Sequence, residues 1–320
     1  MFTLQDPLRQ TDLPSGCVAT IGNFDGLHLG HQAIIAGVVA RAREMGVPSA
    51  AITFHPHPLS IVAPERVPRQ ILTLPQKEEL LAAMGLDALL VIPFTHEFSR
   101  WTAERFVREF LVGALHIKEV HIGRDFCFGA GRAGNLELLE RFGQELGFNV
   151  VGVEDVKVRG IRVSSSLVRR AIQKGAMRLA TLVLGRNYFI DGRVATGRRL
   201  GRKIGFPTVN VDPANDLFPG SGVYITTSRF QTFSGTFESV TNIGIRPTLY
   251  ENYATTIESH ILDFDANVYD DSVRVYFHEL LRREHRFRSA VELTAQIRSD
   301  IEHSRLFFLR QLAEKVKLPL

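Results

Sequence analysis

The chain has 320 residues, of which 45% are hydrophobic and 22% charged; this ordinary globular composition excludes a disordered or fibrous protein. Its length suits about two domains of roughly 100–200 residues each. A formal net charge of +4 is only mildly basic, and it fits a nucleic-acid partner as well as a small polyphosphate substrate.

No apolar run reaches the ~18 residues that a membrane helix needs, and residues 1–7 lack the basic and apolar segments of a secretory signal. The two cysteines, Cys17 and Cys127, are too few for a disulfide framework or a zinc site. Reduced cysteines suit the cytoplasm. We therefore expect a cytoplasmic protein that does not bind membranes.

In the first half of the chain, short apolar runs alternate with segments whose apolar residues recur at helical spacing. Short apolar runs predict buried strands at residues 17–21, 50–54, 88–92, 119–122 and 149–153. Helical patterns lie between them at residues 31–44, 75–84, 103–115 and 136–146, and Thr73 with Gln76 has the spacing of a capping box. Because parallel strands need crossover connections, this alternation predicts an α/β domain with a parallel sheet and helices on both faces.

The pattern changes near Leu184. Short β segments without intervening helices follow at residues 188–195, 222–229, 235–243, 255–262 and 272–280, which predicts an antiparallel barrel or sandwich. A final helix is expected from 290 to 315, with Leu293, Ile297, Ile301 and Leu312 on its buried side. We therefore divide the chain into a domain of residues 1–183 and a domain of residues 184–320.

A glycine-rich turn follows the first predicted strand. Gly22, Gly26 and Gly30 let backbone N–H groups approach a ligand closely, and the helix that begins near His31 favours an anion at its N-terminus. His28 and His31 flank Gly30 and are suited to donate hydrogen bonds to phosphate oxygens, which stabilises charge that builds up in a nucleotidyl transfer. A histidine pair without a ligand, or half of a metal site, is the simpler interpretation. The coincidence of strand, glycines, histidines and helix favours phosphate binding.

A second glycine motif imitates a dinucleotide-binding fingerprint. Residues 129–134 fit G-x-G-x-x-G, and Glu154 follows at the expected distance. However, the preceding strand is predicted to end near Ile122, too early for a tight strand-to-helix turn. We therefore disfavour this interpretation.

The second half contains polar residues suited to phosphoryl transfer, although no P-loop motif occurs in the chain. Thr208 and Asn210 offer neutral oxygens to a Mg²⁺–phosphate complex. Glu258 lies on a predicted strand, where a carboxylate is suited to deprotonate an attacking hydroxyl. Taken alone, these residues are better explained by a solvated loop and, for Glu258, by a cross-strand ion pair.

These segments together resemble one known family. With FHPHP at 54–58, GRDFCFG at 123–129 and VSSSLVR at 163–169, they are similar to the bacterial bifunctional riboflavin kinase/FMN adenylyltransferases, in the family's order over essentially the whole chain. The resemblance implies a Rossmann-like nucleotidyltransferase domain, followed by a riboflavin kinase domain that is a small Greek-key β-barrel with a C-terminal helix.

The resemblance also implies roles in the first domain. His28 and His31 correspond to catalytic residues, and the ATP-binding set corresponds to Gly22, Phe24, Gly30, Ser164, Ser165, Ser166 and Arg169. The three serines and the arginine match the family's mobile phosphate-binding loop, although a plain helix N-cap explains the serines as well. His57 and Asp125 resemble the flavin side of the site; His57, between two prolines, also fits a rigid surface turn.

For the kinase domain, the resemblance makes Glu258 the catalytic base. The implied ATP- and Mg²⁺-binding residues are Gly201, Lys203, Phe206, Pro207, Thr208 and Asn210, with Thr208 and Asn210 at the metal. The sequence departs from the family at two places: Val209 replaces the usual Ala, and Asp270 replaces the usual Gly. Either change is expected to weaken the kinase site without abolishing it.

The implied function is FAD synthesis in two ATP-dependent steps: riboflavin to FMN, and FMN to FAD with release of pyrophosphate. The alternative is a single adenylyltransferase whose barrel only binds flavin. An RNA-binding or flavin-sensing regulator is the non-enzymatic alternative, disfavoured by separate catalytic signatures in both halves. We expect ATP, riboflavin and FMN as partners, with no nucleic acid; an oligomer is compatible with the sequence.

Overall fold

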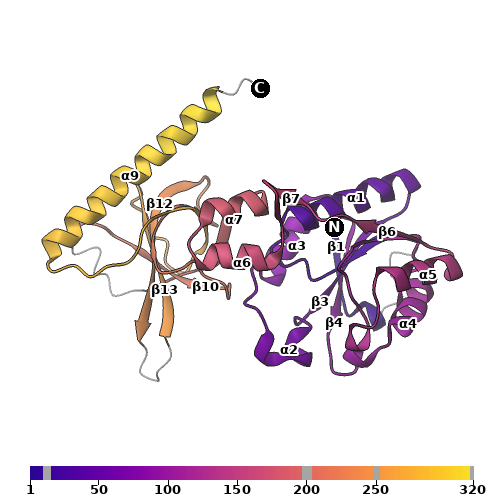
Figure 1. The fold of residues 1–320 in the computed structure, drawn as a ribbon. Coiled ribbons are helices and arrows are strands. Elements are labelled where there is room, and N and C mark those ends of the chain that lie inside the picture. The colour runs from indigo at the N-terminus through magenta and orange to yellow at the C-terminus, as the bar shows by residue number, and fades with distance from the viewer. Residues whose placement is uncertain (10–15, 197–203, 248–252, 318–320) are drawn as a thin grey trace. The chain divides into compact units, whose positions relative to one another are not determined.

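The computed structural model describes residues 1–9, 16–196, 204–247 and 253–317 (Figure 1). The chain divides into two compact units, Met1–Ser165 and Ser166–Leu320. In the part of the chain that is described, every helix is too short or too polar to cross a bilayer.

The first unit is built on a six-stranded sheet in which every neighbouring pair is parallel. Its strands are β1 (Phe2–Gln5), β2 (Val18–Ile21), β3 (Ser49–His55), β4 (Ala88–Pro93), β5 (Glu119–Gly123) and β6 (Asn149–Val153), in the order β1-β4-β3-β2-β5-β6. The predicted parallel sheet is confirmed. β1, which pairs with β4 at the edge, is an addition to the five predicted strands.

Helices connect the strands of this sheet along the chain. They are α1 (Leu29–Met45), α2 (Leu59–Val62), α3 (Leu74–Ala83), α4 (Ala103–Arg105) and α5 (Leu136–Leu146). Short 3₁₀ turns lie at Pro7–Arg9, Pro64–Arg66, Phe98–Arg100 and Ala130–Arg132, and β7 (Lys157–Val158) pairs with β8 (Ile161–Arg162) in a small hairpin. One prediction is corrected: the helix expected over 103–115 is a single α turn followed by a π-helix, Phe106–Ala114.

The sequence explains how these helices are placed. α1 packs on β2, β3 and β5, while an apolar cluster that includes Phe106, Phe110 and Leu139 fills the opposite face. The predicted capping box at the start of α3 is present: the Thr73 hydroxyl accepts from the Gln76 backbone N–H, and the Gln76 side chain accepts from that of Thr73.

The strand order fixes where a ligand fits best. From β2 the chain continues outward through β3 and β4 on one side, whereas β5 and β6 extend the sheet on the other. The loops that follow β2 and β5 therefore leave the sheet in opposite directions at its carboxyl edge. Open α/β sheets bind ligands at such a switch point. The predicted phosphate-binding turn follows β2, and Asp125 of the predicted flavin side follows β5, whereas His57 follows β3.

The second unit is a closed antiparallel barrel, which decides between the predicted barrel and sandwich. Its strands are β9 (Tyr188–Ala195), β10 (Val209–Pro213), β11 (Gly222–Phe230), β12 (Phe237–Pro247), β13 (Tyr253–Ile261) and β14 (Ser272–Arg282), in the order β10-β13-β12-β11-β14-β9. Before the barrel come α6 (Ser165–Gln173) and α7 (Met177–Leu184), and α7 packs on β14 and β9.

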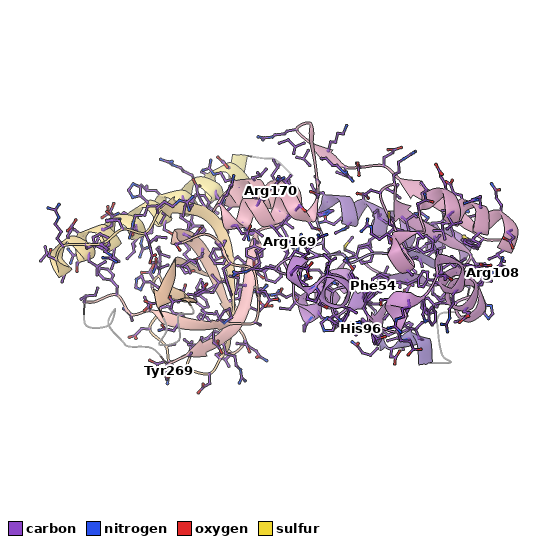
Figure 2. All side chains as sticks on the ribbon, turned by 60° about the horizontal axis from the view of Figure 1, so that its bottom comes forward. Phe54, His96, Arg108, Arg169, Arg170 and Tyr269 are labelled. Atoms are coloured by element: carbon purple, nitrogen blue, oxygen red, sulfur yellow. The ribbon has the colours of Figure 1, made fainter. Side chains whose placement is uncertain are left out.

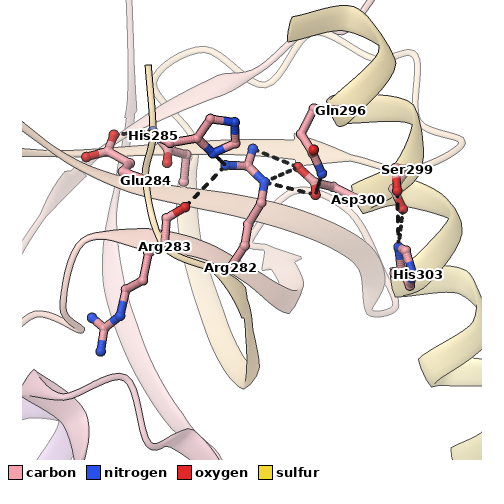
Figure 3. Close-up of polar contacts among 9 residues, drawn as sticks. Arg282, Arg283, Glu284, His285, Gln296, Ser299, Asp300 and His303 are labelled. Carbon is pink, nitrogen blue, oxygen red and sulfur yellow. Dashed lines mark hydrogen bonds and ion pairs between the residues drawn. The ribbon is translucent and has the colours of Figure 1, made fainter. Parts of the chain in front are cut away.

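The last helix, α9 (Ala290–Lys317), is tied to the barrel by a partly buried ion pair (Figure 3). Arg282 at the end of β14 donates to both carboxylate oxygens of Asp300, at 3.0 Å from Nε and 2.9 Å from Nη2, and Gln296 donates to the same carboxylate. The predicted helix is confirmed, but one of its expected buried residues is wrong: the Leu312 side chain is 61% exposed. The contact face of α9 instead includes Asp300 and Ser304, both buried.

Candidate active sites in the two units

The loop after β2 follows an unusual backbone path. Phe24, Gly26 and Leu27 all have positive φ, at 47°, 84° and 43°. Gly26 also lies so close to Ile71 that a Cβ on it would come within 2.9 Å of the Ile71 side chain. Residues with side chains rarely adopt this conformation, so the surroundings must hold the loop in it.

The two predicted histidines lie against each other at the start of α1. Their rings are stacked with centroids 3.7 Å apart, and the His28 Nδ1 accepts a hydrogen bond from the His31 backbone N–H, which makes His28 the N-cap. Because Nδ1 is an acceptor there, a neutral His28 carries its proton on Nε2. Gly30 allows this packing, since a Cβ on it would lie 3.2 Å from the His28 ring.

His31 is neutral, and one of its ring nitrogens is buried without a hydrogen-bond partner among the described residues. Burial lowers the pKa of its imidazole well below the usual value, and the charges of His28 and Lys77 lower it further. Its Nδ1 is buried with no hydrogen-bond partner among the described residues. Phe24 packs its ring edge against this histidine, with centroids 5.5 Å apart. A buried unpaired nitrogen at a predicted ligand site is what a bound phosphate or ribose would satisfy.

Two charged residues that were not predicted from the sequence anchor the loop. The buried Asp25 carboxylate accepts hydrogen bonds from the backbone N–H groups of Ile71 and Leu72, the shortest at 2.9 Å. The buried Lys77 ammonium donates to the Asn23 carbonyl at 2.7 Å. Burial lowers the pKa of Lys77 to about 8, while the Asp25 charge opposes that shift.

The predicted serine segment is divided between the two units. Ser164 and Ser165 belong to the first unit, and the Ser165 hydroxyl donates to the Asp25 backbone carbonyl at 2.8 Å. It therefore joins the loop that holds Gly22, Phe24 and the two histidines. Ser166 and Arg169 belong to the second unit, where they lie on α6. Arg169 is labelled in Figure 2.

The predicted flavin-side residues have partners of their own. The His57 Nδ1 accepts from the Leu59 backbone N–H at 3.2 Å, and its Nε2 lies 3.5 Å from the Asn23 amide nitrogen. The Asp125 carboxylate forms an ion pair with Arg162, at 2.5 Å.

Aromatic side chains gather near the carboxyl ends of β3 and β4, a feature not predicted from the sequence. Phe54, labelled in Figure 2, lies near the end of β3 and is half-buried. Its ring centroid is 5.7 Å from that of Phe94 and 6.0 Å from that of Phe98. Phe98 contacts Trp101 in turn, at 5.2 Å. Rings of this kind offer flat apolar faces to a planar ligand.

The dinucleotide-like motif at 129–134 does not form a strand–turn–helix. β5 ends at Gly123, a 3₁₀ turn occupies Ala130–Arg132, and α5 begins only at Leu136. Gly134 instead forms an antiparallel bridge with Phe128. The expectation that this motif does not bind a dinucleotide agrees with its geometry.

In the barrel, the predicted kinase residues align across neighbouring strands. Asn210 on β10 pairs in register with Glu258 on β13, and Glu258 pairs with Asn242 on β12. Since side chains alternate along a strand, these three share one face of the barrel wall. Asn242 was not predicted; its amide donates to Glu284 at 3.4 Å.

Val209 lies on the opposite face from this row. Its register partner is Ser259, which is fully buried in a chain of five hydroxyls inside the barrel. Successive oxygens of this chain are 2.7 to 3.0 Å apart, in the order Ser228, Ser239, Thr226, Thr241 and Ser259. The valine therefore packs on the side away from Asn210 and Glu258.

His260 connects Glu258's strand to the segment before Thr208. Its Nδ1 donates to the Pro207 backbone carbonyl at 2.7 Å, and its ring meets Phe206 edge-on at 5.8 Å. It thus holds the predicted Phe206–Thr208 segment against β13. The predicted residues Gly201 and Lys203 lie outside the described residues.

The second departure from the family pattern has a backbone explanation. Asp270 has φ = 63°, in the left-handed region where glycine is favoured. Aspartate is among the residues that tolerate this region best, and the Asp270 N–H bonds to the Val194 carbonyl at 3.0 Å. The turn is kept although the glycine is absent.

Comparison with known proteins places both halves in one family. The family model for FAD synthetase matches residues 10–167, and the model for riboflavin kinase matches residues 184–308. A bifunctional riboflavin kinase/FMN adenylyltransferase of Pseudomonas fluorescens is 39% identical over 91% of this chain and 92% of its own length. The chain belongs to the bifunctional riboflavin kinase/FMN adenylyltransferase family.

Other relatives agree. The bifunctional enzyme of Escherichia coli K12 is 38% identical over 92% of this chain and 93% of its own length. A solved structure described as a macrolide-efflux protein from Streptococcus pneumoniae has a TM-score of 0.86 at 27% identity, covering 95% of this chain and 99% of that one. The predicted family is confirmed, and the match of both family models favours two activities over an adenylyltransferase alone.

Proposed function

We propose that this chain makes FAD from riboflavin in two ATP-dependent steps. Residues 184–320 would phosphorylate riboflavin to FMN, and residues 1–183 would join FMN to the AMP part of a second ATP. Family membership supports both activities, and each half has its own group of polar residues on the expected elements. The cytoplasm, suggested by the two free cysteines, is the expected location.

In the kinase step, Glu258 would accept the proton of the riboflavin 5′-hydroxyl as its oxygen attacks the γ-phosphorus of ATP. The bond between that phosphorus and the β–γ bridging oxygen breaks, and ADP leaves. Positioning supplies most of the acceleration in such a transfer. The register that aligns Glu258 with Asn210 supports this role, since one residue would face the hydroxyl and the other the phosphates.

Mg²⁺ would enter this site with ATP. Within residues 1–9, 16–196, 204–247 and 253–317, no group of three or more His, Cys, Asp or Glu side chains is arranged to hold a metal by itself. That fits Mg²⁺, which keeps waters and binds through phosphates and one or two protein oxygens. The Thr208 hydroxyl and the Asn210 amide oxygen would be those ligands. When bound, the ion neutralises charge on the transferred phosphate.

In the adenylylation step, a phosphate oxygen of FMN would attack the α-phosphorus of ATP, and pyrophosphate would leave. The nucleophile is already anionic, so no strong base is required. The His28 Nε2–H and the His31 ring would donate hydrogen bonds to the phosphates as charge builds on them. The Nδ1 of His31, which is buried without a hydrogen-bond partner among the described residues, supports this role. Ser164 and Ser165, which belong to the same unit, would bind the polyphosphate, and the family resemblance assigns Ser166 and Arg169 to the same loop.

The flavin of this step would lie on the β3–β4 side of the switch point. The partly buried rings of Phe54, Phe94 and Trp101, which pack on the buried Phe98, would offer ring faces to the isoalloxazine. Asp125, which follows β5, would contact the flavin from the other side of the switch point.

The observation that supports the two-step reading best is the pairing of Asn210 with Glu258, because it gives the barrel a reactive arrangement and not only a binding surface. The test is to incubate the full chain with riboflavin, ATP and Mg²⁺ and to separate the flavins. FAD formed from riboflavin supports both activities. FAD formed only from supplied FMN would leave a single adenylyltransferase, and no conversion would indicate a regulator.

A further inference from the structure

Lys77 is a buried cation beneath the loop that follows β2. It lies one turn into α3, and only 7% of its surface is exposed. Its ammonium donates to the Asn23 carbonyl at 2.7 Å and lies 3.4 Å from the Thr53 hydroxyl on β3. Lysine is almost never buried to this degree unless its charge is used or compensated.

Hydrogen bonds therefore hold the loop after β2 at two residues, Asn23 and Asp25. Lys77 binds the carbonyl of Asn23, and the Asp25 carboxylate is bound by the backbone N–H groups of Ile71 and Leu72, just before α3. Between and after these points lie the left-handed residues Phe24 and Gly26. A strained path persists only where its surroundings fix it, and residues 71–77, which lead into the first turn of α3, supply both fixing contacts.

We propose that Lys77 is a positioning residue for adenylyl transfer: its ammonium fixes the Asn23 carbonyl, and so the loop that leads to His28 and His31, and it adds positive charge beneath the site where the polyphosphate binds. This inference rests on the proposed adenylylation. It requires no contact between Lys77 and ATP, because the residue acts through the loop.

If the charge of Lys77 is required, the rate of FMN adenylylation should fall when Lys77 loses its proton at alkaline pH. The titratable groups that face it are Asp25 on the loop and His31 on α1; its other neighbours, Asn23 and Thr53, are neutral. Burial lowers the pKa of the ammonium to about 8, so it is charged at pH 7 and largely neutral at pH 9. Since kcat/KM reports the free enzyme, kcat/KM for ATP should fall above about pH 8.

The experiment measures FMN adenylylation by the full chain between pH 6.5 and 10, in the parent, Lys77→Arg, Lys77→Met and Lys118→Met. Arginine stays charged throughout, so the alkaline fall should be absent from K77R, whatever its level at pH 7. K77M should lose on the order of 10- to 100-fold in kcat/KM at pH 7, the scale for a hydrogen bond to a charged group, and its profile should be flat.

Lys118→Met is the matched control. Lys118 is exposed and directly precedes β5, at the amino edge of the same sheet, so its loss should leave both the rate and the pH profile at parental values. Riboflavin phosphorylation, measured in the same samples, reports any general alkaline damage.

The outcomes are distinct. A parent that adenylylates FMN with no fall in kcat/KM below pH 10, or a fall that persists unchanged in K77R, overturns the role of Lys77 and leaves the adenylylation standing. A parent that forms no FAD from FMN at any pH overturns the proposed function itself. If K77M fails to fold, the comparison of parent with K77R still decides.

Discussion

Asn210 and Glu258 are direct partners in the antiparallel register of β10 and β13, so an amide and a carboxylate from segments 48 positions apart lie side by side on one face of the barrel. Without the family resemblance, the sequence around Asn210 fits a solvated loop and Glu258 fits a cross-strand ion pair. Their alignment supports the proposed kinase site on geometry that does not depend on the resemblance.

Replacing Glu258 by Gln keeps the shape of the side chain and removes the base. We expect riboflavin phosphorylation to fall by roughly 10²–10⁴-fold, the usual contribution of a general base. Adenylylation of supplied FMN should persist, because His28 and His31, the residues proposed to stabilise its transition state, lie in the other unit. Initial rates of both reactions in one preparation test this, and parental FMN formation by E258Q would make Glu258 a structural residue.

His260 offers a finer test of the same site. Leucine in its place removes the hydrogen bond to the Pro207 carbonyl, which should raise the kinase KM for ATP by roughly 2- to 10-fold, the net value of one neutral hydrogen bond. Asparagine places an N–H donor where Nδ1 stood and should restore most of the loss. Equal KM values in H260L and the parent would show that the Phe206–Thr208 segment does not depend on this contact.

Val209 replaces the alanine usual in the family, and the structure shows it packing towards the buried hydroxyls and away from Asn210. We therefore expect Val209→Ala to open a small cavity and lower the free energy of unfolding by about 1–3 kcal/mol, nearer the lower end because the valine is only half-buried. Kinase turnover should not change. Urea unfolding and steady-state rates check this; faster turnover with undiminished stability would show that the valine strains the site.

The boundary predicted at 183/184 can be tested with fragments. α7 packs on β14 and β9 and buries Met177, Ala180, Val183 and Leu184, so a fragment that starts at 184 would leave barrel surface uncovered. We expect residues 166–320 to melt at a higher temperature than residues 184–320 and to phosphorylate riboflavin. Equal melting temperatures would show that α7 adds nothing to the barrel.

Most elements could be predicted because their hydrophobic pattern is local. Tyr188–Ala195 and Asn149–Val153 have the predicted bounds, and the capping box at Thr73 is a fixed spacing. β1 was missed because Phe2–Gln5 is short, partly exposed and defined only by pairing with β4. Leu312 fits a helical stripe but lies exposed near the end of α9, and the buried face of that helix includes an ion-paired Asp300 instead.

Some residues of the candidate sites could likewise be predicted from local spacing, and others could not. Glycines and histidines that follow a strand can be found by spacing, so the turn at Gly22–His31 was predictable. The burial of Lys77 was not, since a lysine in the first turn of an amphipathic helix is normally solvated. Likewise, the alignment of Asn242 with Glu258, and the contact of His260 with Pro207, depend on strand register and on contacts between distant segments.

The central claim is that one chain holds two separate active sites. Its most direct test is to mix two full-chain variants, each of which lacks one of the two activities. E258Q should be unable to start from riboflavin, and His31→Ala should stop at FMN, with adenylylation reduced by roughly 10²–10³-fold, as for loss of one preorganised donor. Incubated together with riboflavin, ATP and Mg²⁺, the two variants should form FAD at a rate that neither reaches alone, because FMN released by H31A is the substrate of E258Q. If the mixture forms no more FAD than the variants do separately, while the parent converts riboflavin fully, the two activities do not reside in independent sites and the account is wrong.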